Sequence, residues 1–250
     1  LPAPSRAERV SLMIRGYEIR ALLFDVFGTV VDWRSGIIRE LAAWGTDTHV
    51  VADWPAIADG WRGLYQPAME RIRAGNRGFV RLDILHEENL RDIFAEHGLD
   101  APIGEDLHRL VTGWHRLDPW PDAVSGLARL KTRHIIAPCS NGNIALITNM
   151  AKRAGLPWDA VLGAEVAQAY KPHPQAYLGS ADALSLKPEE CMMVAAHLDD
   201  LEAAAELGFA TAYVPRPDEH GKGAGAETAP DGSVDFVAVD FNALADQLDC

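Results

Sequence analysis

The chain has 250 residues, 48% of them apolar, which is enough for one large domain or for a core domain with an insert. Its formal net charge of −13 argues against nucleic acid and against an anionic membrane as partners. No apolar run approaches the roughly 20 residues of a membrane span. Residues 1–12 lack the apolar core of a signal peptide. We therefore expect a soluble cytoplasmic protein in which residues 1–12 are a disordered arm or an expression remnant.

The first predicted strand is the apolar run Ala21–Phe24, which ends in Asp25. A continuous apolar run is typical of a strand buried on both faces of a parallel sheet. An unpaired carboxylate is costly to bury, so we expect Asp25 at the carboxyl end of the strand, where open α/β sheets bind ligands. Gly28, ahead of Thr29, allows a tight turn that brings backbone N–H groups near an anion. The alternative is that Asp25 only caps a turn.

Helical periodicity follows from residue 33 to residue 118, with no strand predicted between. Predicted helices begin near Trp33, Trp54, Arg81 and Glu105, and the second extends to about Ile72. Glycines at 75 and 98 are typical helix-stop signals. Such a run of helices fits a simple βαβ repeat poorly.

Strands and helices alternate after the proline-rich stretch at 118–121. Strands are predicted at 134–139, 160–163, 191–195, 210–214 and 236–239, and helices at 124–130, 144–154, 174–184, 201–207 and 241–248. Residues 216–232 are rich in Pro, Gly and Asp and are predicted to form an exposed loop. The alternation predicts an α/β fold with a doubly wound parallel sheet.

The three cysteines have no spacing typical of a disulfide framework or a zinc site. Cys139 and Cys191 lie in predicted strands, so we expect buried thiols. Cys250 is the last residue.

Polar side chains recur where later strands end. Ser140 and Asn141 follow the strand at 134–139, where a hydroxyl, an amide and backbone N–H groups favour an anion, although an ordinary helix N-cap is the alternative. Lys171 lies in a constrained loop ahead of two prolines, and its alternative is a solvated surface lysine. Asp200 follows the strand at 191–195 and precedes an alanine-rich helix.

Together these segments resemble the four motifs of the haloacid dehalogenase superfamily, over the chain from about Glu18 to its end. Asp25 stands at the nucleophile, Ser140 at the second motif, Lys171 in K-P-x-P at the third, and Asp200 at the fourth. Most phosphatases of the superfamily carry a proton-donating aspartate where this chain has Phe27, which cannot donate a proton. The pattern FDxFGTxxD resembles the (S)-2-haloacid dehalogenase (type II) branch, whose halide leaving group needs no proton.

The resemblance implies a Rossmann-like core of residues 13–32 and 119–250, with residues 33–118 inserted as a helical cap over the active site. It implies that Lys171 stabilises the charge of the nucleophile Asp25 and that Asp200 positions or activates the hydrolytic water. Catalytic roles for Ser140, which would hold the substrate carboxylate, and for Thr29 are implied as well. The residues implied to bind substrate or halide are Val26, Phe27, Arg62, Asn141, Tyr177 and His197.

Three of these assignments have alternatives. Arg62 follows Trp61 as in the family's halide-binding pair, yet it could be a solvated helix arginine, as we expect of Arg71 and Arg73. Tyr177 could be a core residue. His197 stands where the family often has asparagine; it could donate a hydrogen bond to the halide or the water, or be a packed neutral side chain.

The fourth motif also bears on metal binding. In magnesium-dependent phosphatases it reads G-D-x-x-x-D, and with Asp200 on the last aspartate, Ala196 falls on the first. One carboxylate that Mg²⁺ would need is therefore missing. We expect no metal and no organic cofactor.

The resemblance implies hydrolysis of short 2-haloalkanoic acids through an aspartyl ester, and the histidine at 197 suggests a compact halide site that accepts fluoroacetate. The expected partner is a small haloacid. The family often dimerises, and tryptophans of the cap could supply an interface. Alternatives are a magnesium-dependent phosphatase and a non-catalytic small-acid binder on the same fold.

Overall fold

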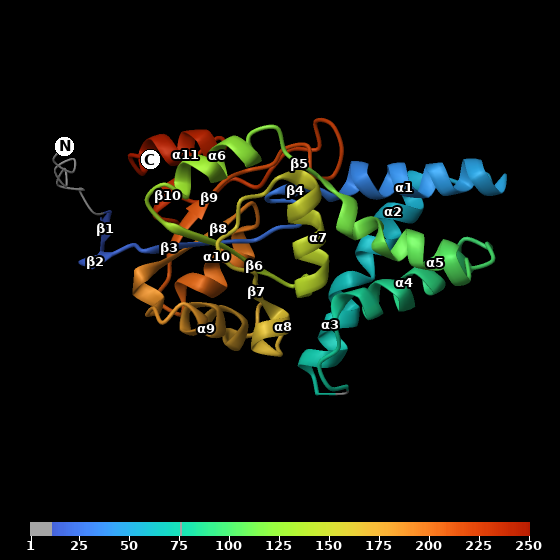
Figure 1. Cartoon of the computed structure of the whole chain (residues 1–250), viewed down its shortest axis with the longest axis horizontal. Helices are drawn as coiled ribbons and strands as arrows, with labels where there is room; N and C mark the ends of the chain where they lie inside the picture. The colour runs from blue at the N-terminus through green and yellow to red at the C-terminus, as the bar shows by residue number, and fades with distance from the viewer. Residues whose placement is uncertain (1–11, 76) are drawn as a thin grey trace, which may run out of the picture.

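A computed structural model describes residues 12–75 and 77–250 (Figure 1). The arm predicted at residues 1–12 lies outside the described residues, apart from Leu12. Strands β1 (Met13–Ile14) and β2 (Tyr17–Glu18) form an antiparallel hairpin that the sequence did not predict. Arg15 and Gly16 connect them with φ angles of 52° and 86°. Positive φ at both positions is what a two-residue type I′ turn requires.

Six parallel strands form the central sheet in the order β10-β9-β8-β3-β6-β7. Their bounds are β3 Ala21–Phe24, β6 Ile135–Ser140, β7 Leu162–Gly163, β8 Cys191–Ala195, β9 Ala210–Tyr213 and β10 Phe236–Val237. The first of them in the sequence, β3, lies at the centre between β6 and β8. The strand order reverses there, and ligands bind at such a point beyond the carboxyl ends of the strands. The predicted doubly wound α/β sheet is confirmed.

Helices cover both faces of this sheet, as Figure 1 shows. One face carries α6 (Ala123–Leu130), α7 (Ile144–Ala154) and α11 (Phe241–Gln247), and the other carries α9 (Pro174–Ala183) and α10 (Leu198–Ala205). The short helix α8 (Ala164–Ala167) lies beside α9 and β7. Leu22 and Phe24 of β3 join the apolar cluster on the first face, and Ala21 and Leu23 join the second. Successive side chains of a strand point to opposite faces, and all four are fully buried because helices cover both faces. A short 3₁₀ helix, η2 (Pro188–Glu190), precedes β8.

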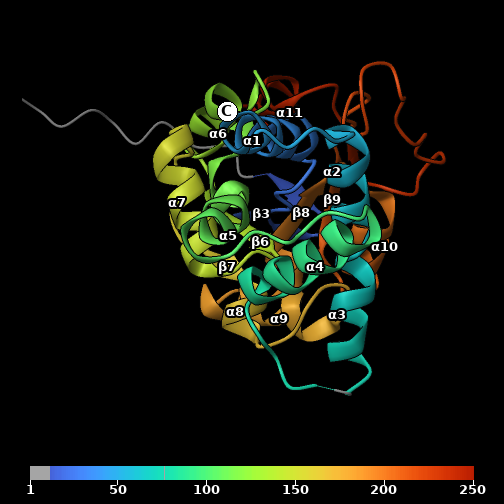
Figure 2. The same ribbon diagram turned by 90° about the vertical axis from the view of Figure 1, so that its right-hand side faces the viewer.

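A helical segment lies between two short strands, β4 (Val31–Asp32) and β5 (Asp118–Pro119), which pair antiparallel. Its helices are α1 Trp33–Thr48, α2 Trp54–Gly63, α3 Tyr65–Arg73, α4 Leu82–Glu96, α5 Gly104–Val111 and the 3₁₀ helix η1 Thr112–Arg116. Figure 2 shows α4 and α5 in front of the ends of β3, β6 and β8. The inserted helices therefore lie over the edge of the sheet at which Asp25 is placed.

The sequence predicted one helix from Trp54 to about Ile72, and this prediction is wrong. The structure interrupts it at Leu64, between α2 and α3. Pro67 has no N–H to donate to the carbonyl of Gly63, so the helical ladder breaks at that turn.

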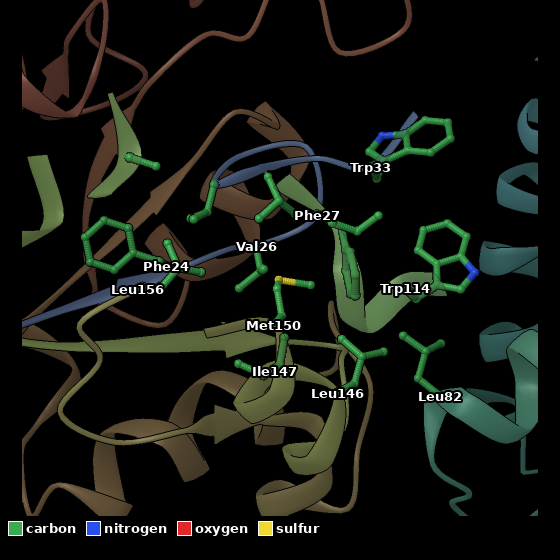
Figure 3. Packing of buried hydrophobic residues seen from close by; sticks show 14 of the residues in the cluster. Phe24, Val26, Phe27, Trp33, Leu82, Trp114, Leu146, Ile147, Met150 and Leu156 are labelled. Atoms are coloured by element: carbon green, nitrogen blue, oxygen red, sulfur yellow. The ribbon is translucent and has the colours of Figure 1, made fainter. Parts of the chain in front are cut away.

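Apolar packing continues from the sheet into the inserted helices (Figure 3). Phe24 of β3 and Met150 of α7 belong to this cluster, and Phe27 lies beyond the end of β3. The ring of Phe27 meets Trp114 of η1 edge-on at 5.8 Å, and Trp114 stacks on Trp33 at 6.3 Å. Such aromatic pairs contribute about 0.5–1.5 kcal/mol each beyond the area that they bury. Phe27 thus joins the two parts of the molecule.

Cys139 and Cys191 are free and buried, as predicted. Burial raises the pKa of Cys139 to about 11 and that of Cys191 to about 12, so both stay protonated thiols.

Within residues 12–75 and 77–250, no helix has the length and apolar character needed to cross a bilayer.

Candidate active site

The carboxylate of Asp25 is buried just beyond β3 and contacts polar groups through both oxygens. Lys171 Nζ lies 3.0 Å from Oδ1. Thr29 Oγ1 donates to Oδ2 at 2.7 Å, and His197 Nδ1 lies 3.3 Å from the same oxygen. Burial alone would raise the pKa of Asp25, but Lys171, His197 and Thr29 outweigh it and hold the pKa well below its usual range. Asp25 is therefore an anion throughout the neutral range.

A tight loop after β3 brings Thr29 back to Asp25. Gly28 has a φ of 88°, which favours glycine, and its N–H donates to the carbonyl of Val31 at 3.0 Å. The carbonyl of Val26 accepts from the N–H groups of Val30 and Val31. Thr29 Oγ1 also accepts from the N–H of Ala196 at 2.9 Å, which leaves its own hydrogen for Asp25.

Lys171 connects two carboxylates. Its Nζ lies 3.0 Å from Asp25 and 2.5 Å from Oδ2 of Asp200, and its backbone N–H donates to Asn141 Oδ1 at 2.7 Å. Burial would lower the pKa of Lys171, but Asp200 and Asp25 together raise it above its usual value. The ammonium is thus retained although the side chain is buried. The predicted contact between Lys171 and Asp25 is present, and a solvated surface position is excluded.

Asp200 lies in the first turn of α10 and is buried. Tyr177 donates its hydroxyl to Asp200 Oδ1 at 2.5 Å, and burial raises the pKa of Tyr177, so it remains a donor. The pKa of Asp200 is raised by burial and by Asp25, with Lys171 acting against them. Asp200 is consequently a stronger base than an ordinary aspartate.

His197 lies between two carboxylates. Its Nδ1 is 3.3 Å from Asp25 Oδ2, and its Nε2 is 2.9 Å from Glu219 Oε2. Burial disfavours the charged ring, but hydrogen bonds to Asp25 and Glu219 raise its pKa to about 10. At neutral pH both ring nitrogens carry hydrogen, so His197 is a cation rather than the packed neutral side chain that the sequence left open.

The inserted helices supply the opposite wall. Arg62, near the end of α2, stacks its guanidinium over Tyr65 at 4.0 Å and over Trp33 at 5.5 Å. The Tyr65 hydroxyl forms a hydrogen bond with Asn141, and burial raises its pKa. Arg73, predicted as solvated, instead donates to the carbonyl of Lys171 at 2.9 Å. The inserted helices are thus tied to the loop that carries the buried lysine.

These groups enclose a cavity of about 170 Å³. Its lining consists of Asp25, Phe27, Arg62, Tyr65, Gln66, Asn141, Lys171, Pro172, Tyr177, His197, Asp199 and Asp200. The other predicted site residues, Val26, Thr29 and Ser140, are fully buried and do not belong to this lining. Ser140 Oγ accepts from the N–H of Gly142 at 3.1 Å, so it faces the backbone. A direct contact between Ser140 and a substrate stays a prediction.

Within residues 12–75 and 77–250, no group of three or more His, Cys, Asp or Glu side chains is arranged to hold a metal ion. Magnesium-dependent phosphatases have a metal-binding aspartate where this chain has Ala196. The backbone N–H of Ala196 donates to Thr29 Oγ1.

Comparison with known proteins agrees with this geometry. Residues 19–208 match the family of haloacid dehalogenase-like hydrolases. The chain belongs to that family. A solved structure of a defluorinating L-2-haloacid dehalogenase is 47% identical, with a TM-score of 0.92 over 96% of this chain and 100% of that one. A second L-2-haloacid dehalogenase structure is 43% identical, with a TM-score of 0.86 over 92% and 99%.

Among curated relatives, (S)-2-haloacid dehalogenase 4A of Burkholderia cepacia is 29% identical over 201 residues, which cover 79% of this chain and 84% of that protein. The resemblance to the 2-haloacid dehalogenase branch is thus confirmed.

The sequence analysis missed several site side chains of this haloacid dehalogenase-like hydrolase, among them Pro172 and Asp199 of the cavity lining. Tyr65 and Gln66 also line the cavity, and neither belongs to a motif that could mark it in the sequence. Glu219 contacts His197 from a loop that was predicted to be exposed, yet Glu219 is only 5% exposed and Arg216 only 8%. No local pattern marks Glu219, because the groups that bury it come from distant parts of the chain.

Proposed function

We propose that the chain is a hydrolytic dehalogenase of short 2-haloalkanoic acids and that it acts through an ester of Asp25. The main support is the ionised, buried carboxylate of Asp25, which lines a small cavity beside Phe27. Most phosphatases of the superfamily carry a proton donor at that position, whereas a departing halide needs none. The named relatives are dehalogenases of this kind.

In the first step, one carboxylate oxygen of Asp25 attacks C2 of the substrate, and the carbon–halogen electrons leave with the halide. In-line attack inverts the configuration at C2. Arg62 of the inserted helices and Asn141 of the core both line the cavity, and together they hold the departing halide. Backbone N–H groups and Ser140 hold the substrate carboxylate.

In the second step, water attacks the ester carbonyl of Asp25. Asp200 takes the proton of this water, for which its raised pKa suits it. Lys171, 3.0 Å from Asp25, stabilises charge at the reacting carboxyl group. The products are a 2-hydroxy acid, halide and free Asp25.

The division of the chain follows the same proposal. Residues 13–32 and 119–250 form the catalytic core, and residues 33–118 form a cap that closes over the bound acid. The hydrogen bond from Arg73 of the cap to the carbonyl of Lys171 of the core supports closure from the cap side. Closure would remove water from the nucleophile before attack. A cytoplasmic location and a homodimer stay predictions.

We include fluoroacetate among the proposed substrates. The 47% identical relative is a defluorinating enzyme, and the cavity of about 170 Å³ suits an acid of two or three carbons. Fluoride is the halide that accepts hydrogen bonds most strongly, and Arg62 in the cavity lining supplies charged N–H donors for it.

The test is halide release from fluoroacetate, chloroacetate and 2-chloropropionate with EDTA present. We expect release from all three and none after Asp25→Asn. Phosphate release from p-nitrophenyl phosphate that requires Mg²⁺ and stops with EDTA would instead establish the phosphatase. Chloroacetate binding with no halide release would establish the small-acid binder. Release of chloride but not of fluoride would overturn only the fluoroacetate part.

A further inference from the structure

The loop between β9 and β10, drawn in orange-red in Figure 2, brings one carboxylate to the active site. Glu219 is 5% exposed. Its Oε1 accepts from Trp33 Nε1 at 3.0 Å, and its Oε2 lies 2.9 Å from His197 Nε2. A buried carboxylate with two N–H partners is held in a defined orientation.

The same loop is anchored to the loop that follows the nucleophile. Arg216 Nε donates to the carbonyl of Thr29 at 2.9 Å, and its terminal nitrogens donate to both oxygens of Asp122 at 2.7 and 2.9 Å. The N–H of Glu219 donates to the carbonyl of Arg216 at 3.1 Å. One turn therefore links the position of Glu219 to that of Thr29.

Gly28 makes room for this carboxylate. A Cβ at Gly28 would lie 2.1 Å from Glu219 Oε1, which is closer than real contacts allow. The nucleophile loop and the Glu219 loop consequently fit each other only with glycine at 28.

The two oxygens of Asp25 have different surroundings. Oδ2 has Thr29 Oγ1 at 2.7 Å and His197 Nδ1 at 3.3 Å, whereas Oδ1 has Lys171 Nζ at 3.0 Å. A carboxylate oxygen has two in-plane lone pairs, so Oδ1 retains one for attack on carbon and Oδ2 does not. Oδ2 thus becomes the carbonyl oxygen of the ester.

We propose that Glu219 is a positioning residue that holds His197 with its Nδ1–H directed at Asp25 Oδ2, where His197 and Thr29 stabilise the oxyanion of ester hydrolysis. This inference rests on the proposed function and adds the Asp25–His197–Glu219 arrangement to it. His197 then acts mainly in the second chemical step, because the first step only needs Oδ1.

The water oxygen bonds to Cγ of Asp25, one water proton passes to Asp200, and the carbonyl electron pair moves onto Oδ2. When the carbonyl re-forms, the bond between Cγ and Oδ1 breaks, and the hydroxy-acid oxygen leaves with the proton from Asp200. The carboxylic acid left at Asp25 releases the second water proton to solvent. Removing one oxyanion donor typically costs about 10²–10³ in rate.

The experiment compares Glu219→Gln with wild type and with Asp231→Asn, an exposed carboxylate of the same loop. Glutamine keeps the shape of Glu219 but removes its charge. We expect E219Q to release one equivalent of chloride per enzyme in a burst, followed by turnover at least about 10-fold slower than wild type. The ester should accumulate and be visible by intact-protein mass spectrometry, while D231N behaves as wild type.

Two further measurements keep the test decisive. His197→Gln should show the same burst, and adding E219Q to it should slow turnover no further, because both act through one ring. Nitrogen-15 NMR of labelled histidine should report a charged His197 at pH 8 in the wild type and a neutral ring in E219Q.

Wild-type turnover in E219Q, or a slower burst with no accumulated ester, would overturn the inference. A wild-type protein that releases no halide would contradict the proposed function instead. The NMR measurement would then still decide whether Glu219 holds His197 in its charged form.

Discussion

Phe27 lies two residues after Asp25 and is surrounded by aromatic side chains. Phe27 is only 3% exposed, and its ring meets Trp114 at 5.8 Å and Tyr65 at 6.4 Å. A carboxyl group at this position would lie among aromatic rings, where an unpaired charge is costly. The packing around Phe27 therefore favours chemistry that needs no proton at the leaving group.

Substitution of Arg62 tests its proposed contact with the halide. We expect Arg62→Gln to lower kcat for chloride release from chloroacetate by about 10²-fold, because the departing halide loses a charged donor. Arg71→Gln is the matched control, since Arg71 is an exposed arginine of the neighbouring helix α3. Equal losses in the two variants would show that Arg62 acts only as a surface charge.

His197 gives a prediction about pH and stability. Its pKa in the folded protein is raised to about 10, so its stabilising contribution is complete below the unfolded value of about 6.5 and is lost as pH rises through 10. The free energy of unfolding of wild type relative to H197Q should therefore shrink by roughly 2–4 kcal/mol between pH 6.5 and pH 10. Urea unfolding at several pH values measures it, and a difference that grows with pH would contradict the charged state.

Among the elements, α4 and α7 connect the inserted helices to the core through a reciprocal pair. Asn143 Nδ2 donates to Asp83 Oδ2 at 2.9 Å, and the N–H of Asp83 donates to Asn143 Oδ1 at 3.2 Å. His115 Nε2 lies 3.0 Å from the other oxygen of Asp83. This pair fixes α4 against the start of α7, beside the strand end that carries Asn141.

We expect Asn143→Ala to raise KM for chloroacetate several-fold and to lower the free energy of unfolding by about 1–3 kcal/mol, because Asp83 loses a buried partner. Asn242→Ala removes a hydrogen bond to Ser125 at the other end of the core and serves as control. Steady-state kinetics and urea unfolding give both quantities. A normal KM in N143A would show that this pair does not contribute to closure over the substrate.

Much of the element order could be predicted from the sequence. Ala21–Phe24, Cys191–Ala195 and Ile144–Ala154 were predicted with both ends correct, since continuous apolar runs and a terminal glycine mark them locally. The break at Leu64 was missed because helical periodicity outweighed Pro67. The β1–β2 hairpin and the short helix α8 were missed because each has too few residues for a period to appear.

Some site residues could likewise be predicted from the sequence, and others could not. Asp25, Asn141 and Asp200 could be placed near one another because parallel strands present their carboxyl ends at one edge. Glu219 could not, since its burial depends on Trp33, Gly28 and His197, which are far from it in the sequence. Loop composition indicates exposure on average and says nothing of one inward-facing side chain.

For the whole molecule, the acidic charge bears on substrate capture. The net charge is −13, and the cavity lining holds three acidic and three basic side chains: Asp25, Asp199 and Asp200 against Arg62, Lys171 and His197. The lining thus adds no net attraction for an anion, and the field of the surrounding protein is repulsive.

We therefore expect kcat/KM for chloroacetate to rise with ionic strength, because the Debye length shortens from about 30 Å at 0.01 M to about 8 Å at 0.15 M. Sodium sulfate is the suitable salt, since it adds no halide, and kcat should stay unchanged. A fall in kcat/KM would mean that the cavity cations dominate the encounter.

The covalent role of Asp25 is tested most directly by a single turnover in water labelled with oxygen-18, with enzyme in excess over chloroacetate. Hydrolysis of an Asp25 ester predicts that the label enters the Asp25 carboxyl group, found by mass spectrometry of its peptide, while the first hydroxy acid released stays unlabelled. Label in that first product, with none in Asp25, would contradict the account.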